Sequence, residues 1–197
     1  SAASDVYKRQ GAVQLSPDTR AGNWDACSGY HYNDTTLKGF SHTHLSGTGC
    51  IDLGDILFRP TTLKPDLTTE SIYQPAAFSH KDEDASAGYY SVVLKEEGIK
   101  AELTVTAHAG MHRYTFPSGK EASIIIDLTH LLDNEYIYEA ELEQTAANEI
   151  TGMRRTRGWT DNQYVYFVAQ FSKPFQTIDF IQNKKMVSAG VKLNGTD

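Results

Sequence analysis

The sequence predicts an all-β protein built as an antiparallel β-sandwich. Short apolar segments recur at near-regular spacing along the chain, residues typical of turns separate them, and no segment shows the apolar spacing of a long amphipathic helix. Alternation of apolar and polar residues is the pattern of a strand that buries one face. Several such strands separated by turn signals are typical of sandwiches in which neighbouring strands run antiparallel.

The first clear strand lies about a quarter of the way along the chain. Ile51–Phe58 is short and apolar, and we expect it to end before Pro60 because proline cannot donate a hydrogen bond to a sheet. The next segment, Thr61–Lys81, is rich in threonine and contains Pro65 and Pro75. That composition predicts an irregular connection.

The strand pattern is clearest in the middle of the chain. Gly88–Leu94 alternates up to a turn at Glu96–Gly98, and Ile99–Ala107 follows as a second alternating strand. In this strand Leu103 lies on one face and Glu102 on the other, as expected for a half-buried sheet. The same signals, with a turn at Pro117–Lys120, predict strands at His112–Phe116, Ser123–Leu128, Tyr136–Leu142, Glu149–Arg155, Tyr164–Phe171 and Phe175–Ile181.

The bulk composition restricts the class of protein. A chain of 197 residues with 40% hydrophobic and 22% charged residues is long enough for one domain with a sizeable core. Its net charge of −7 argues against nucleic-acid binding, which requires a basic surface, and suits a neutral ligand such as a sugar. No apolar run approaches the roughly 18 residues that a membrane-spanning helix needs, so we expect no membrane span.

The first ten residues are not expected to belong to the protein. Ser1–Gln10 matches the translation of a transposase sequencing adaptor (TCG GCA GCG TCA GAT GTG TAT AAG AGA CAG), so we exclude it from the fold. Without its Lys8, Arg9 and Asp5 the 18 basic and 25 acidic residues become 16 and 24, a net charge of −8. We expect residues 11–197 to be an incomplete β-sandwich domain, an internal fragment of a longer protein from shotgun-sequenced metagenomic DNA.

The segment Asn23–Gly49 carries the strongest functional signal. Its sequence, NWDACSGYHYNDTTLKGFSHTHLSGTG, combines Trp, Tyr, Phe, Cys and His with many Gly, Ser and Thr, and follows neither a helical nor a strand period. Burial of an apolar face therefore does not explain its composition. Long irregular loops of polar and aromatic residues are typical of functional sites.

This segment closely resembles the signature region of the N-terminal domain of glycoside hydrolase family 92. The likeness covers most of Gly11–Ile181, and its segments occur in the same order as in the family. They are GAVQLSPDTR, the signature segment, DLGDILF, HRYTFP at His112–Pro117, GW at Gly158–Trp159 and YFVAQFSKPF at Tyr166–Phe175. Members of this family are calcium-dependent exo-α-mannosidases, so the resemblance implies a hydrolase that releases mannose from α-mannosides such as N-glycans or mannan.

The family's two-domain design implies what this chain contributes. An N-terminal β-sandwich packs on a C-terminal (α/α)₆ barrel, and an acid and a base on opposite sides of the sugar invert the anomeric configuration. By resemblance, both catalytic carboxylates and most ligands of the Ca²⁺ ion lie in the barrel. We therefore expect no catalytic residue and no metal ligand in this fragment, which should be inactive alone and form one wall of the interdomain pocket. Periplasmic or extracellular localisation follows from the same resemblance.

Trp24 and Asp25 are the first two candidates for substrate binding. Apolar faces of a pyranose ring stack on aromatic side chains, and a carboxylate accepts hydrogen bonds from sugar hydroxyls. The alternatives are a tryptophan that anchors the loop on the sandwich and an aspartate that caps a turn. The sequence leaves both alternatives open.

His42 and His44 are the other two candidates, because their spacing places both on one face of an extended segment. Such a pair can bind zinc, but no third ligand stands at a recognisable spacing, and imidazole prefers softer metals than calcium. Hydrogen bonding remains, either within the loop or to substrate at the pocket wall.

Other polar residues have structural and functional interpretations. Asp52 and Asp55 could form an acid–base pair, but their place beside a strand favours turn or capping roles. Three arginines, Arg154, Arg155 and Arg157, fit either a solvated edge or salt bridges to the absent barrel. The two cysteines, Cys27 and Cys50, flank the signature segment and would form a disulfide in an exported protein or stay reduced.

Two further functions remain open. A non-catalytic, lectin-like β-sandwich would bind sugar through Trp24 and the loop aromatics. A zinc hydrolase would use His42 and His44. Composition and periodicity indicate only a β-sandwich with a functional loop, and the assignment to α-mannosides depends on the family resemblance.

Overall fold

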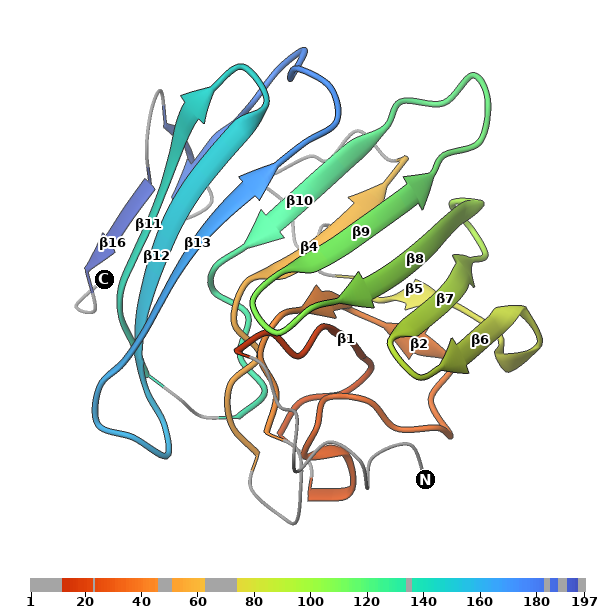
Figure 1. The fold of residues 1–197 in the computed structure, drawn as a ribbon, viewed down its shortest axis with the longest axis horizontal. Coiled ribbons are helices and arrows are strands. Elements are labelled where there is room, and N and C mark those ends of the chain that lie inside the picture. The colour runs from red at the N-terminus through yellow and green to blue at the C-terminus, as the bar shows by residue number, and fades with distance from the viewer. Residues whose placement is uncertain are drawn as a thin grey trace. The chain divides into compact units, whose positions relative to one another are not determined.

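The all-β prediction is confirmed by the structure. The computed structural model describes residues 12–22, 24–45, 51–62, 74–133, 136–182, 185–187 and 191–194. Strands make up 50% of the chain, and within the described residues the only helical elements are two short 3-10 helices, at Trp24–Ala26 and His80–Asp82. The chain separates into two compact units, one ending at residue 133 and the other containing the described residues from 136 onward (Figure 1).

The first unit contains two four-stranded antiparallel sheets and a small two-stranded pair. One sheet has the order β1-β3-β4-β10, the other β6-β7-β8-β9, and β2 pairs with β5. Their bounds are β1 Ser16–Asp18, β2 Thr36–Leu37, β3 Gly39–Ser41, β4 Leu57–Thr61, β5 Ala76–Ala77, β6 Glu83–Ser86, β7 Tyr89–Leu94, β8 Ile99–Val105, β9 Gly110–Thr115 and β10 Ser123–Asp127.

Side chains from both sheets meet in one apolar core. Phe40 of β3 packs against Tyr114 of β9 with ring centroids 6.3 Å apart, and Phe58 of β4 stacks on His112 of β9 at 5.2 Å. This contact between inner faces is what a β-sandwich requires. The buried members of the core are Leu37, Phe40, Ala76, Phe78, Val92, Leu94, Ile99, Ala101 and Leu103.

Pro60 does not end its strand, so that expectation was wrong. β4 continues through Pro60 to Thr61, and Pro60 lies opposite Ile124 of β10. On its other side, β4 pairs with β3 only at Phe58, opposite Phe40. Among the described residues that pair is the whole of the ladder on the second side of β4, and a proline is tolerated where no N–H donor is needed.

Three predicted boundaries also differ from the structure. The signature segment contains the 3-10 helix at Trp24–Ala26 and the strands β2 and β3. The predicted connection Thr61–Lys81 contains β5, while residues 63–73 lie outside the described part of the chain. In place of a strand at Phe175–Ile181, only Phe180–Gln182 (β14) is extended.

The second unit contains a four-stranded antiparallel sheet and a two-stranded ribbon. The sheet has the order β13-β12-β11-β16, and β14 pairs with β15. The remaining bounds are β11 Tyr136–Ala146, β12 Glu149–Arg157, β13 Gln163–Gln170, β15 Lys185–Val187 and β16 Val191–Asn194.

The three clustered arginines have different environments. Arg154 is fully buried. Arg155 lies over the rings of Tyr138 and Tyr164, at 4.8 Å and 5.3 Å from their centroids, a cation–π arrangement. Only the exposed Arg157, with its Nε 3.6 Å from Asp161, fits the solvated-edge interpretation.

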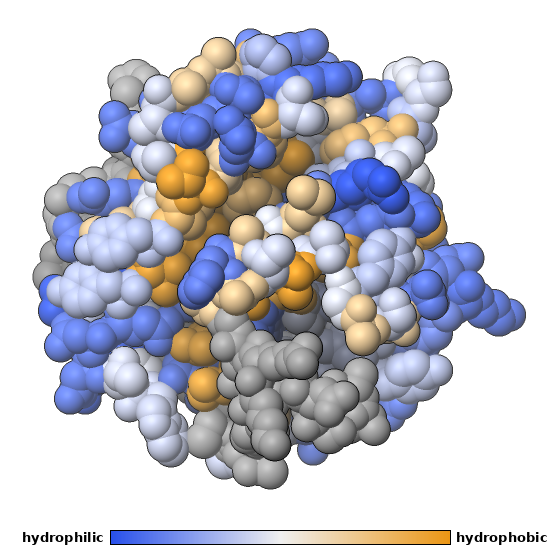
Figure 2. All heavy atoms as spheres, in the orientation of Figure 1, coloured by the Kyte–Doolittle hydropathy of each residue, from blue (hydrophilic) through white to orange (hydrophobic). Residues whose placement is uncertain are grey.

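The surface agrees with the composition. Hydrophilic side chains dominate the rim of the face drawn in Figure 2. Among the described residues no helix is long and apolar enough to cross a membrane.

A chain of hydrogen bonds links the two sheets of the first unit. The Nδ1 of His42 lies 2.6 Å from the carbonyl of Ile56, so this nitrogen must carry a proton and donate it. The Nε2 of His112 lies 2.9 Å from the Nε2 of His42, and Tyr114 contacts the Nδ1 of His112 at 2.7 Å. One consistent assignment follows: Tyr114 donates to His112, His112 donates to His42, and both imidazoles are neutral.

Burial explains why both histidines stay neutral. It lowers the pKa of His42, and it lowers the pKa of His112 to about 3, with the nearby His42 adding to the effect. In the unfolded chain both groups return to an ordinary pKa of about 6.5. The unfolded state therefore binds more protons than the folded state between these values, and the free energy of unfolding falls as the pH drops below 6.5.

Replacing His112 by glutamine should reduce this acid sensitivity. We expect the free energy of unfolding of the chain to depend less steeply on pH between 6 and 4 in His112→Gln, by about 1 kcal/mol per pH unit. Urea unfolding at a series of pH values, followed by circular dichroism, measures both slopes. Equal slopes in the two proteins would contradict the neutral assignment of His112.

Candidate functional site

The loop between β1 and β2, which we call the signature loop, has an exposed tip and a buried base. It begins after Asp18, the last residue of β1, contains the first part of the signature segment, and has the 3-10 helix Trp24–Ala26 at its tip. Trp24 is 72% exposed, Asp25 is exposed and Tyr32 is 66% exposed. A compact loop with close ends and an exposed tip is a common way to present functional side chains.

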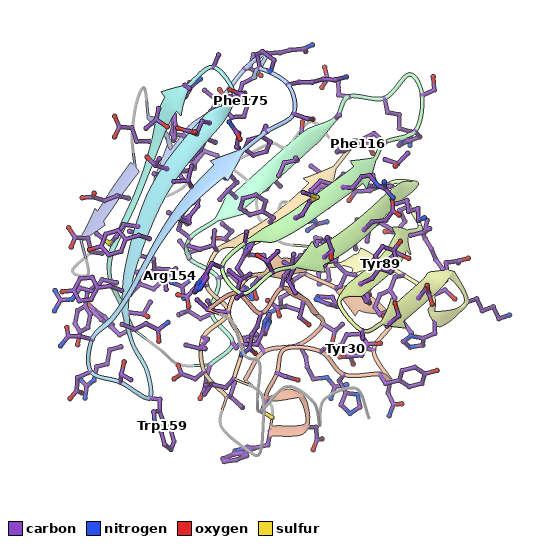
Figure 3. All side chains as sticks on the ribbon, viewed as in Figure 1. Tyr30, Tyr89, Phe116, Arg154, Trp159 and Phe175 are labelled. Carbon is purple, nitrogen blue, oxygen red and sulfur yellow. The ribbon has the colours of Figure 1, made fainter. Side chains whose placement is uncertain are left out.

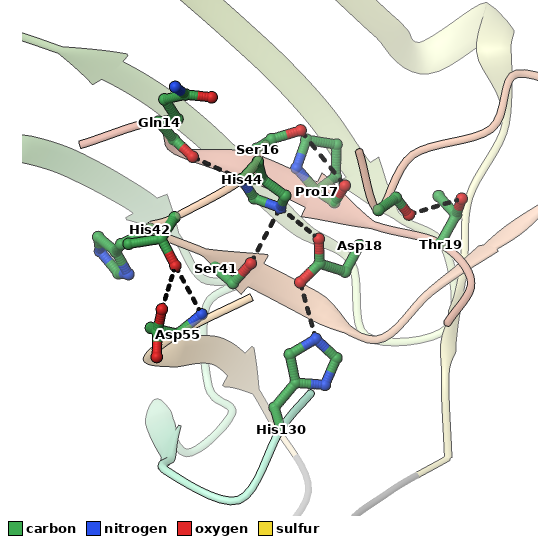
Figure 4. Close-up of polar contacts among 12 residues, drawn as sticks. Gln14, Ser16, Pro17, Asp18, Thr19, Ser41, His42, His44, Asp55 and His130 are labelled. Atoms are coloured by element: carbon green, nitrogen blue, oxygen red, sulfur yellow. Dashed lines mark hydrogen bonds and ion pairs between the residues drawn. The ribbon is translucent and has the colours of Figure 1, made fainter. Parts of the chain in front are cut away.

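A buried carboxylate forms the centre of the base. Asp18, at the end of β1, is fully buried, and its two oxygens contact two different imidazoles (Figure 4). Oδ1 lies 2.7 Å from Nε2 of His44, and Oδ2 lies 2.8 Å from Nε2 of His130. His44 follows β3, and His130 follows β10, so one side chain joins three segments of the first unit.

The contacts of His44 define its charge. Its Nδ1 lies 2.6 Å from the carbonyl of Gln14, which can only accept, and its Nε2 faces the Asp18 carboxylate, with Ser41 Oγ at 3.0 Å. Both ring nitrogens therefore donate, and the ring is an imidazolium.

The pKa directions agree with this ion pair. Burial alone would lower the pKa of His44, but the charge and hydrogen bond of Asp18 and the Gln14 carbonyl raise it. Burial alone would raise the pKa of Asp18, but the imidazoles of His44 and His130 bring it well below its usual range.

The loop stem rests directly on this ion pair. Gly29 lies so close that a Cβ at its position would be 2.2 Å from Oδ1 of Asp18 and 3.1 Å from Nε2 of His44. The carbonyl of Gly29 accepts hydrogen bonds from the backbone N–H groups of Thr19, at 2.7 Å, and Arg20, at 3.2 Å. The two sides of the loop are thus closed immediately above the carboxylate.

Two further groups of contacts fix the returning half of the loop. Arg20 makes a bidentate ion pair with Asp34, with Nε 2.7 Å from Oδ2, and this hydrogen bond lowers the pKa of Asp34. Tyr30 donates to Glu83 at 3.1 Å. Glu83 also accepts from Tyr90, at 2.7 Å, and contacts His80, at 2.6 Å, while Tyr32 stacks on His80 with centroids 4.3 Å apart.

The structure divides the four predicted site residues into two pairs. Trp24 and Asp25 are exposed together on the 3-10 helix. His44 is 4% exposed and bound to Asp18, whereas His42 bonds to Ile56 and His112. The histidines therefore use their ring nitrogens inside the fold, and their contact with substrate stays a prediction.

Asp52 and Asp55 accept hydrogen bonds inside the fold, and their turn or capping roles stay a prediction. Both are buried. Asp52 Oδ1 accepts from the N–H of Leu53 at 2.9 Å, and Asp55 Oδ2 accepts from the hydroxyl of Thr43 at 2.5 Å. Cys50 lies outside the described residues, so its predicted pairing with Cys27 stays a prediction.

Three residues of the site were not found from the sequence. Asp18, Glu83 and His130 lie in segments without an evident motif, and 112 positions separate Asp18 from His130. Of the three, Asp18 alone lay in one of the short segments quoted for the family resemblance. A single sequence contains no signal for pairs at this separation.

The described residues do not fit a calcium site. Within them no group of three or more His, Cys, Asp or Glu side chains is arranged to hold a metal ion. The most concentrated set, around Asp18, supplies imidazole nitrogens that donate to the carboxylate, whereas calcium takes oxygen ligands. No catalytic step through a metal is therefore derived from this chain.

Replacing Gly29 by alanine tests how closely the stem packs on the ion pair. Gly29 has φ +83° and Gly88 has φ +77°, but a Cβ at Gly88 meets nothing within 4 Å. Gly88→Ala should therefore cost about 1 kcal/mol for its backbone conformation alone. We expect Gly29→Ala to lose about 2 kcal/mol more from the overlap with Asp18, as measured by urea unfolding. Equal losses of unfolding free energy in the two variants would show that the loop stem moves away from the added methyl group without further loss of stability.

Comparisons with known proteins show the family and the fold. Residues 10–197 match the model of the glycosyl hydrolase family 92 N-terminal domain. The family GH92 α-mannosidase BT3965 of Bacteroides thetaiotaomicron, also solved in complex with mannoimidazole, is 39% identical over 96% of this chain and 26% of its own, with a TM-score of 0.87. An inverting GH92 mannosidase of the same organism, BT2199, is 21% identical over 94% of this chain and 24% of its own; its TM-score of 0.74 shows the shared fold.

A fungal relative also matches. An uncharacterized secreted glycosidase of Arthroderma benhamiae is 31% identical over an alignment of 121 positions that covers 54% of this chain and 15% of the relative. The chain thus spans about a quarter or less of the length of these proteins. It belongs to glycoside hydrolase family 92, as the N-terminal domain.

Proposed function

We propose that this chain is the N-terminal part of an inverting exo-α-mannosidase that releases mannose from α-mannosides such as N-glycans or mannan. Its signature loop forms one wall of an active site shared with a following (α/α)₆ barrel. The observation that carries the proposal is the exposed Trp24, held at the tip of a loop with a rigid polar base. Family membership and the mannoimidazole complex of BT3965 support the substrate class.

The loop tip has the chemistry of a sugar-binding wall. A tryptophan ring that is 72% exposed offers an apolar face for the C–H groups of a pyranose, and the adjacent exposed Asp25 carboxylate accepts hydrogen bonds from hydroxyls. The polar groups at the base are already bonded to one another. They contribute to the site by holding the tip in place.

The barrel supplies the reaction in this proposal. Inversion requires an acid and a base about 6.5–9.5 Å apart with a water between them. A bound calcium ion would grip adjacent hydroxyls of mannose, since it prefers oxygen ligands. This chain orients the sugar, and it is inactive alone. Periplasmic or extracellular localisation is proposed as well, with support from the secreted relative.

Replacing Trp24 by alanine tests the wall. The protein to use is a chimera in which residues 11–197 replace the matching N-terminal part of BT3965. We expect Trp24→Ala to lower kcat/KM for an α-mannoside about tenfold, the equivalent of one lost stacking contact. Trp159→Ala is the matched control, because Trp159 is 75% exposed at the turn between β12 and β13 (Figure 3) and should leave kcat/KM unchanged.

Residues 11–197 alone should release no mannose from the same substrate. Hydrolysis by this fragment would contradict the placement of the catalytic groups in the barrel. A chimera that is folded but inactive, together with saturable binding of mannosides by the fragment, would instead support the non-catalytic sugar-binding module. If the chimera is active and Trp24→Ala leaves its kcat/KM unchanged, Trp24 does not contribute to the sugar-binding wall.

A further inference from the structure

We propose that Asp18 is a positioning residue for the sugar-contacting tip of the signature loop. Its carboxylate, held between His44 and His130, sets the place at which the loop stem closes, and so the position of Trp24. The inference rests on the proposed function, because it assigns Asp18 to the same sugar-binding wall. It adds a residue that touches no substrate and lies outside the four predicted site residues.

The first argument is that the apolar core does not require this carboxylate. Asp18 is fully buried, and the partners of its carboxylate are the imidazoles of His44 and His130. Removing a carboxylate from water is costly, and well-packed apolar residues stabilise an interior at least as well as a buried ion pair. What an ion pair adds is geometry, because its hydrogen bonds are directional and each has one place to form.

The second argument is that both halves of the stem rest on the group that Asp18 assembles. On one side Gly29 packs against its Oδ1 and accepts hydrogen bonds from the two residues after Asp18. On the other side the N–H of Gly22 donates to the carbonyl of Leu132 at 2.5 Å, two residues beyond His130. Because His130 is fixed by Oδ2 of Asp18, the carboxylate locates both contacts.

The third argument concerns the exposure of Trp24 itself. Trp24 is 72% exposed, so its position follows from the backbone of the stem rather than from packing of its own ring. Small displacements matter in such a wall, since a shift of about 1 Å in a positioning group can cost about 100-fold in rate. The carboxylate thus acts on the sugar through Trp24.

An isosteric change isolates the effect. In Asp18→Asn the side chain offers one acceptor and one donor in place of two acceptors, so the imidazole that faces the amide nitrogen must give up its Nε2 proton and accept a hydrogen bond, and the ion pair is lost. In the chimera we expect kcat/KM to fall by up to about tenfold, the loss expected when Trp24 itself is removed. In a Trp24→Ala background the same change should have little further effect, because the side chain through which it acts is gone. Additive effects would overturn the proposal.

A second readout follows the tip directly. The sequence contains two tryptophans, so in the chain with Trp159→Phe the fluorescence reports Trp24 alone. Asp18→Asn should lower its steady-state anisotropy and raise its quenching by acrylamide while the circular dichroism stays unchanged. Unchanged anisotropy and quenching in a folded variant would overturn the positioning role, whatever the activity.

Glu102→Gln is the matched control. Glu102 of β8 is 8% exposed and accepts from Tyr89, at 2.8 Å, and from Arg113, at 2.6 and 2.8 Å, without touching the loop. It is the same carboxylate-to-amide change in the same unit. It should lower stability and leave the anisotropy of Trp24 and the kcat/KM of the chimera unchanged. Effects on either quantity as large as those of Asp18→Asn would show a merely structural role for Asp18.

Outcomes for the two proposals can be told apart. If Trp24→Ala has no effect on activity, the proposal that Trp24 forms part of the sugar-binding wall is wrong. The anisotropy of Trp24 still shows whether Asp18 positions the loop. If Trp24→Ala lowers kcat/KM, but Asp18→Asn changes neither kcat/KM nor the fluorescence of Trp24, the sugar-binding role of Trp24 is supported and the positioning role of Asp18 is wrong. Should Asp18→Asn not fold, His130→Ala removes one of the two donors, leaves the bond to His44, and is measured in the same two ways.

Discussion

The ion pair between Asp18 and His44 is the contact on which the functional end of the first unit depends. It is buried, it involves both oxygens of the carboxylate once His130 is included, and it joins segments that follow β1, β3 and β10. A buried charge without such partners would be strongly destabilising. The loop stem closes above it only because Gly29 has no side chain, so the backbone and the ion pair constrain each other.

Two histidines separated by one residue differ in charge in this fold, since His42 is neutral and His44 carries a positive charge. His42 is neutral because its neighbours are a carbonyl and another buried imidazole, whereas His44 is charged because it faces a carboxylate. The contribution of His44 is complete below its unfolded pKa of about 6.5 and is lost as the pH rises through its raised folded value. The chain of hydrogen bonds through the neutral His112 has the reverse pH dependence, and its contribution to stability is lost as the pH falls below 6.5. The Asp18–His44 ion pair therefore limits the pH range of stability on the alkaline side, and the hydrogen bonds of neutral His42 and His112 limit it on the acidic side.

The sequence could predict the fold class and the loop because both follow from local patterns. Alternation located strands such as β7 and β8 almost to the residue, and the absence of periodicity isolated the segment that contains Trp24. The predicted end of the strand before Pro60 was wrong, because whether a proline breaks a strand depends on which side of that strand has a neighbour. The sequence also missed Asp18 and His130, because their contact joins positions 112 residues apart and needs the fold before it can exist.

Residues that the local sequence pattern identified are those that we propose to contact sugar, whereas residues that depend on long-range contacts are those that hold the loop tip. Residues that we propose to contact sugar, Trp24 and Asp25, stand out in the sequence because they lie in a long segment with neither a helical nor a strand period. Residues that hold the tip, Asp18 and Glu83 among them, are ordinary acids whose role comes from burial and from their partners. A domain that supplies only a wall to a shared active site needs this arrangement. Because the chemistry is proposed to occur in another domain, accuracy of position is what the wall contributes, and directional hydrogen bonds provide that accuracy better than apolar packing does.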